Sequence, residues 1–199
     1  MQTNLINNED RKKLAQDEFD TLNKSVFKGG EGISLRNAID LAERDEAKII
    51  FVDCRGENEK LVSKVKGSVS CDEFESHLDK YDKQKDIIVP YCTIGLRSGC
   101  YCTKVKYHYQ FQNVYNGNGI VLYSHEMPDG DKDECATMIV DKDGKPTKRI
   151  HVYGKRWTEW THDTYTTVIN STLMEQVSSV IHLIFLFCAY LYHSRFFTR

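Results

Sequence analysis

An apolar run that ends in a cysteine is the feature that most limits how this chain can fold. Residues 86–91 read Asp-Ile-Ile-Val-Pro-Tyr, which predicts a short buried strand. Cys92 follows directly, and the loop 92–98 leads into a helix-compatible stretch over 98–108. A second strand is predicted over 48–53, and it is apolar on both faces, as is typical of a parallel sheet.

Further elements are predicted around these two strands. Helices are expected over 8–22, 35–42 and 71–81, and short strands over 69–70 and 114–116. In the first helix, Leu14, Phe19 and Leu22 are the expected apolar contacts. Strands that alternate with helices imply a central parallel sheet with helices on both faces. The expected fold class is therefore α/β with three layers.

The chain after residue 125 has a different character. Residues 127–134 contain Pro128, Gly130 and three aspartates and predict a solvated loop, since they lack the ligand spacing of a calcium loop. The β-rich segments 137–140 and 149–153 flank Asp141-Lys142-Asp143-Gly144, a pattern that predicts a β-hairpin. The expected organisation is an N-terminal polar, helical segment 1–30, a main domain 31–125, a hairpin-containing extension 126–172 and an apolar tail 173–199.

The tail carries a run without Asp, Glu, Lys or Arg over residues 177–192. A membrane span needs about 20 apolar residues, so this run is at the short end of the range. Tyrosines near its end and two following arginines favour a tail anchor with the main domain facing the cytosol. A core or dimer-interface helix is the alternative. The polar, acid-bearing first 20 residues resemble neither a secretion signal nor an import signal.

Composition excludes several functions. A formal net charge of -2 gives no basic footprint for nucleic acid. The seven cysteines show no paired Cys-x-x-C spacing, so we expect neither a metal site nor a cofactor. Unpaired thiols of this kind are typical of an intracellular, reducing compartment.

The loop that begins at Cys92 carries the strongest chemical signal. A side chain at the carboxyl end of a parallel strand lies where open α/β sheets bind their ligands. Loop N–H groups, the following helix dipole and the permanent charge of Arg97 favour an anion there. Gly95 is expected to adopt a positive φ so that the loop can close tightly, and Ser98 to cap the helix. The loop therefore predicts a thiolate nucleophile that faces an anionic group.

The arrangement of Cys92, Gly95, Arg97 and Ser98 resembles the active-site loop of rhodanese domains. Three other segments support the resemblance in the right order. They are Asp53-Cys54-Arg55 with the acidic Glu57 and Glu59 behind it, Gly67 fourteen residues after Asp53, and Gly117-Asn118-Gly119-Ile120. The resemblance covers about residues 33–125, and 146–157 look like an extension of some single-domain members.

The resemblance implies a sulfurtransferase that works through a persulfide on Cys92. Arg97 would stabilise the thiolate and hold an anionic donor, and the substrate-binding loop would comprise Thr93, Ile94, Gly95, Leu96 and Ser98. Asp53 and Arg55 would support the site structurally. The implied partners are a small sulfur donor such as thiosulfate and a thiol acceptor, either glutathione or a thioredoxin-like protein, or cyanide.

Some positions depart from the family pattern. Ser63, Lys64 and Lys66 replace a frequent Gly, His and Pro, and Leu122-Tyr123 stands where a Trp is common. Thr93 replaces the basic residue that thiosulfate-using members often carry, which bears on the choice of donor.

Two other functions compete. Phosphatases on a related fold use Cys-x5-Arg, whereas this loop is Cys-x4-Arg and makes a tighter cradle. A non-catalytic docking module tethered to a membrane is the second alternative. Cys100 and Cys102 could resolve a persulfide, although packing of the helix against the sheet is the favoured interpretation.

Overall fold

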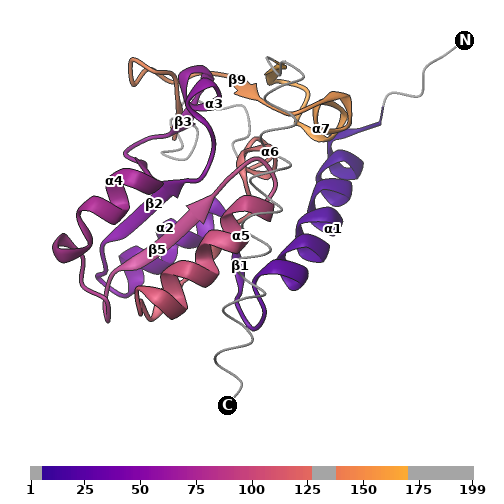
Figure 1. Ribbon diagram of the computed structural model, residues 1–199. Helices are drawn as coiled ribbons and strands as arrows, with labels where there is room; N and C mark the ends of the chain where they lie inside the picture. Colours follow the sequence, from indigo (N-terminus) through magenta and orange to yellow (C-terminus); the bar gives the residue numbers. More distant parts are fainter. Residues whose placement is uncertain (1–5, 127–137, 170–199) are drawn as a thin grey trace, which may run out of the picture.

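A four-stranded parallel sheet lies at the centre of the computed structural model, which describes residues 6–126 and 138–169 (Figure 1). Its order is β4 (Val69–Ser70), β2 (Ile49–Asp53), β5 (Ile87–Tyr91) and β6 (Asn113–Val114). All three pairings are parallel. Every residue of β5 is buried, as its uninterrupted apolar pattern predicts.

Helices cover both faces of the sheet, which confirms the three-layer α/β class. Helix α2 (Leu35–Arg44) buries Leu35, Ala38 and Ala42 in the cluster on one face. Helices α4 (Cys71–Ser76) and α5 (Leu96–Thr103) contribute Phe74 and Cys102 to the cluster on the other face. A 3-10 turn (Leu78–Lys80) follows α4, and a π-helical turn (Lys104–His108) ends α5.

Helix α1 (Asn8–Val26) is longer than predicted and runs beside α5 and α7 (Lys155–Trp160) (Figure 1). Ala15 and Phe19 of α1 are fully buried, and Leu22 packs against the same cluster. The predicted contact of Leu14 is wrong, because this side chain is 41% exposed. The buried positions of α1 recur every three or four residues, and Leu14 falls one residue outside that stripe.

Short elements complete the main domain. Helix α3 (Glu57–Val62) and β3 (Lys64–Val65) follow β2. The strand predicted over 114–116 is divided at Tyr115, so that β6 pairs with β5 while β7 (Asn116–Gly117) pairs with β1 (Gly32–Ile33). Helix α6 (Ile120–Tyr123) then buries all four of its side chains.

The extension folds differently from the predicted hairpin. The chain does turn after Asp141, where the Asp141 N–H donates to the Lys145 carbonyl over 2.8 Å. The pairing of the two flanking segments is wrong, however. Strand β8 (Ile139–Val140) pairs with β3, and β9 (Arg149–His151) pairs in parallel with β10 (Thr166–Val168). A short antiparallel pairing does follow the turn, with Pro146 opposite Val140 and the Thr147 N–H donating to the Ile139 carbonyl over 3.0 Å, but it stops before β9.

Two predictions fall outside the described residues: the solvated loop over 127–134 and the apolar run 177–192. Among the helices within 6–126 and 138–169, none has the length and apolarity that crossing a bilayer requires.

Candidate active site

Cys92 lies directly beyond β5, in the middle of the carboxyl edge of the sheet. Its Sγ accepts a hydrogen bond from the Gly95 N–H at 3.2 Å and another from Ser98 Oγ at 3.5 Å. The residue is only 2% exposed. The loop therefore surrounds the sulfur with hydrogen-bond donors. This is the same loop in which the sequence predicts the nucleophile.

Gly95 shapes this cradle. It has φ of +94° and is the N-cap of α5, as the argument for a tight loop predicts. A Cβ at this position would lie 2.3 Å from the Phe19 ring of α1. The prediction that Ser98 caps the helix is wrong, because the left-handed turn at Gly95 starts the helix at Leu96. Ser98 lies in the first turn instead, where its hydroxyl reaches Cys92.

The surroundings of Cys92 favour its thiolate. Burial raises its pKa, but the Arg97 charge, hydrogen bonds from the side chain and N–H of Ser98, and the Ile94 N–H lower it. The net result is a pKa below that of an ordinary thiol. The two thiols on α5 differ from Cys92 in their pKa. Burial raises the pKa of Cys100 to about 11 and that of Cys102 well above its usual value.

We expect this contrast to appear in the pH dependence of alkylation. The rate of Cys92 modification by iodoacetamide should reach its plateau at a lower pH than the rates at Cys100 and Cys102, because only thiolates react. Peptide mapping by mass spectrometry after short exposures at a series of pH values measures each site. Dividing each rate profile by its own plateau rate separates the effect of the thiol pKa from the effect of how easily the reagent reaches the site. Coincident profiles for Cys92 and Cys100 would contradict the expected order.

Arg97 is held in a network that the sequence did not reveal. Its guanidinium donates to Glu59 over 2.7 and 3.0 Å and to the Tyr153 hydroxyl over 2.9 Å. The Tyr153 hydroxyl in turn donates to Glu59 over 2.7 Å. Burial raises the pKa of Glu59, but Arg97, Arg55 and Tyr153 outweigh it and bring that pKa to about 2. The charge of Arg97 is thus balanced by a carboxylate, and its role toward an anionic donor stays a prediction.

The remaining loop residues surround this network. Thr93 Oγ1 donates to Glu59 over 3.3 Å and accepts from Arg97 over 3.1 Å. Thr93 and Ile94 are buried, whereas Leu96 is half-buried. The structure therefore brings together all the residues proposed for the substrate-binding loop, although the Thr93 hydroxyl faces protein groups.

Asp53 and Arg55 form a buried ion pair next to the loop. Arg55 donates to both carboxylate oxygens of Asp53 over 2.9 and 2.7 Å, and both side chains are at most 1% exposed. The Tyr91 hydroxyl donates to Asp53 over 2.6 Å, and Arg55 also donates to the Ser63 carbonyl over 2.7 Å. These bonds join the end of β2 to the end of β5 and to the segment after α3, and so support the strand end that bears Cys92.

Three residues near the site were missed as functional positions. The sequence marks Glu59 only as an acid that follows Asp53-Cys54-Arg55, and Tyr153 only as part of the extension. Asn116 donates to the Gly95 carbonyl over 2.9 Å and to Asn23 of α1 over 2.8 Å, and so it connects the loop to α1. No local pattern links these positions, because each contact joins segments that are far apart in the sequence.

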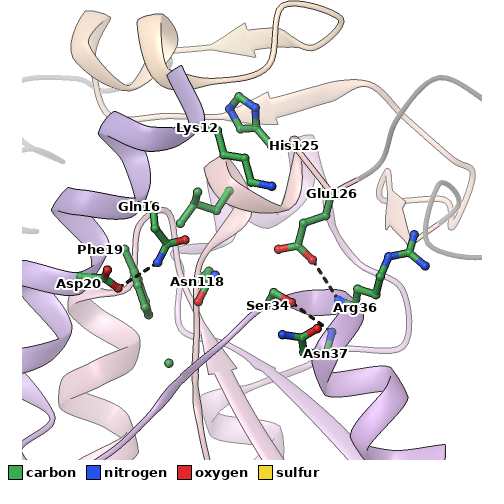
Figure 2. Close-up of a pocket in the computed structure, with 12 residues that line it drawn as sticks. Lys12, Gln16, Phe19, Asp20, Ser34, Arg36, Asn37, Asn118, His125 and Glu126 are labelled. Carbon is green, nitrogen blue, oxygen red and sulfur yellow. Dashed lines mark hydrogen bonds between the residues drawn. The ribbon is translucent and has the colours of Figure 1, made fainter. Parts of the chain in front are cut away.

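Two hollows lie elsewhere on the surface. The larger, of about 630 Å³, lies between α1 and the start of α2, and Figure 2 shows Lys12 and Gln16 facing Glu126 across it. Glu126 accepts the Arg36 N–H there over 3.0 Å. The other, of about 420 Å³, lies at the ends of β2 and β4. Neither is lined by Cys92 or by Arg97.

Comparison with known protein families found no family model that matches the chain. A search of curated proteins found no match either. Solved structures to which the chain shows similarity include a thiosulfate sulfurtransferase from Pseudomonas aeruginosa, at 12% identity over 56% of this chain with a TM-score of 0.43. This chain covers 22% of that protein.

Two further structures are similar over comparable lengths. The polysulfide-sulfur transferase of Wolinella succinogenes is 20% identical over 57% of this chain and 87% of its own, with a TM-score of 0.39. A possible tyrosine phosphatase from Rhodopseudomonas palustris is 20% identical over 60% of this chain and 89% of its own, with a TM-score of 0.35. The structure itself shows a parallel α/β sheet in the order β4-β2-β5-β6, with the Cys-x4-Arg loop directly after β5.

Proposed function

We propose that the protein is a sulfurtransferase that carries a sulfane sulfur on Cys92. The observation that carries this proposal is the contact of Cys92 Sγ with the Gly95 N–H and the Ser98 hydroxyl, in surroundings that lower the pKa of the thiol. A thiolate at this position can act as a nucleophile near neutral pH.

The reaction has two steps. The Cys92 thiolate attacks the outer sulfur of a donor such as thiosulfate, the bond within the donor breaks, and sulfite leaves with that electron pair. An acceptor thiolate or cyanide then attacks the outer sulfur of the persulfide and releases the Cys92 thiolate. The donors around Sγ stabilise the anion that is present before the first step and after the second.

The network around Arg97 bears on which sulfur donor reacts. Glu59 already accepts two hydrogen bonds from Arg97, so the charge that is offered to a sulfonate is reduced. Thr93 adds no positive charge. We therefore expect thiosulfate to react slowly, and an inorganic polysulfide to be the more informative second donor.

The test is the intact mass of the full chain after incubation with each donor and removal of excess reagent. We expect a gain of one sulfur, about 32 Da, that is absent in Cys92→Ser and is discharged by cyanide. Cys100→Ser is the matched control, because it removes a neighbouring thiol from the same helix region and should still form the adduct.

Two outcomes would count against a sulfurtransferase. No adduct from either donor on a folded chain would contradict the proposal and favour a docking module. Release of phosphate from a generic aryl phosphate, dependent on Cys92, would favour a phosphatase instead. The Cys-x4-Arg loop argues against that outcome, because it is one residue shorter than the Cys-x5-Arg cradle of phosphatases.

The setting of this activity is also a proposal. We infer an intracellular, reducing compartment, a thiol acceptor of the glutathione or thioredoxin type, and attachment to a membrane through residues 177–192 with the domain facing the cytosol. The composition and the apolar run of the sequence support these points.

A further inference from the structure

Three cysteines stand in a row across the carboxyl edge of the sheet. Ser70, Asp53 and Tyr91 end three neighbouring strands and are in register with one another. A cysteine directly follows the last residue of each strand: Cys71 after β4, Cys54 after β2 and Cys92 after β5. The strand order β4-β2-β5 places Cys54 between the other two.

Cys54 and Cys71 also lie close enough to be joined. In-register residues of neighbouring strands are about 4.8 Å apart, within the Cα separation that a disulfide requires. Close approach continues past the last paired residues, because Cys71 Sγ lies 3.9 Å from the Asp53 carbonyl. Both cysteines are half-buried and pack against the same apolar cluster.

Cys54 is equally tied to the strand that bears Cys92. Its N–H donates to the Tyr91 carbonyl over 2.9 Å, which continues the ladder between β2 and β5. Burial raises the pKa of Cys54 well above its usual value, and the adjacent Cys71 and Cys92 thiols raise it further. The pKa of Cys92 is lowered, so Cys92 is the better leaving group of these two.

We propose that Cys54 and Cys71 are a dithiol that reduces the sulfur held on Cys92, releases it as hydrogen sulfide and ends as a Cys54–Cys71 disulfide. This activity rests on the proposed function, because the Cys92 persulfide supplies the sulfur. It assigns a reductive second half-reaction to residues of the chain itself.

Two displacements at sulfur carry out the reduction. The Cys54 thiolate attacks the outer sulfur of the Cys92 persulfide, so that the S–S bond breaks and Cys92 leaves as a thiolate. Cys71 then attacks the inner sulfur of the new Cys54 persulfide and expels hydrosulfide. The sulfane sulfur gains two electrons, and the two thiols lose two. One persulfide and two thiols give one thiol, one disulfide and one hydrogen sulfide. An external thiol regenerates the dithiol.

The experiment is a single turnover of the reduced full chain, treated with thiosulfate and with no added thiol. We expect close to one hydrogen sulfide per chain and a Cys54–Cys71 disulfide in the peptide map. In Cys54→Ser and in Cys71→Ser, sulfide release should fall at least tenfold. The persulfide should accumulate on Cys92 in Cys54→Ser, and on Cys92 or Cys54 in Cys71→Ser. Cys100→Ser should release sulfide like the unaltered chain, and circular dichroism verifies that each variant is folded.

The outcomes separate this inference from the proposed function. A Cys92 persulfide without sulfide release in the unaltered chain would overturn the dithiol activity and leave the sulfurtransferase intact. A disulfide that joins Cys54 to Cys92 would overturn it as well. If neither thiosulfate nor polysulfide forms a persulfide in Cys54→Ser, where the dithiol cannot discharge it, the proposed function fails, and the dithiol is then tested in Cys92→Ser. Diamide should still produce the Cys54–Cys71 disulfide in that variant, and failure to do so would exclude the pair.

Discussion

Asp53→Asn is expected to lower the free energy of unfolding by about 3–5 kcal/mol, because it leaves the Arg55 guanidinium buried without its counter-ion. Both side chains are essentially inaccessible to water. The new amide N–H groups would also face donors in either orientation: Arg55 Nε at one position, or Arg55 Nη2 and the Tyr91 hydroxyl at the other. Urea unfolding followed by circular dichroism gives the difference from the shift of the midpoint at constant slope.

Asp45→Asn is the matched control for this change. Asp45 pairs with Arg44 over 2.8 Å, but the two side chains are 47% and 71% exposed. The same chemical substitution should leave the urea midpoint unchanged there, since exposed ion pairs contribute little. Equal midpoints for both variants would show that the buried pair does not support the end of β2 as the geometry indicates.

Gly95→Ala is expected to slow persulfide formation on Cys92 by about 10²-fold, which is the cost of displacing a positioned group by about 1 Å. The added methyl group would collide with the Phe19 ring, so the loop and its N–H would move away from Sγ. The positive φ adds backbone strain, and together we expect a loss of about 1–3 kcal/mol in stability. The rate of mass gain with thiosulfate or polysulfide measures the first effect, and urea unfolding the second.

Gly144→Ala separates strain from collision. Gly144 has φ of +78°, and a Cβ there would meet nothing within 4 Å. This variant should lose some stability through its backbone conformation but keep the unaltered rate of persulfide formation. A normal rate in Gly95→Ala would mean that the loop tolerates the methyl group and that Phe19 does not fix its shape.

The elements with the strongest local signals were predicted well. The apolar runs of β2 and β5 needed no knowledge of their partners, because continuous burial on both faces marks such strands. The positive φ of Gly95 followed from the tightness of a short loop. Helix α2 begins at the predicted residue 35, where Ser34 accepts the Asn37 N–H, which is also a local interaction.

The features that the sequence does not predict depend on contacts between distant segments. Glu59, Arg97 and Tyr153 meet across separations of 38 and 56 residues, and no periodicity in the sequence relates them. The Asp-Gly turn was recognised, but partner choice for β8 and β9 depends on β3 and β10, which approach from elsewhere. Ser98 shows the same limit, since one left-handed glycine decided which residue caps the helix.

Helix α1 has a practical consequence for any attempt to shorten the protein. Phe19 covers Gly95, and Arg11 binds the carbonyls of Glu159 and Thr161 beyond the main domain. A fragment limited to residues 31–125 would keep all four strands of the central sheet, yet it would open the apolar surface that Ala15 and Phe19 cover. Such a fragment should aggregate or recruit chaperones, whereas one spanning 6–169 should remain dispersed. The solubility of such fragments is therefore a better guide to the limits of the folding unit than the range over which the sequence resembles a family.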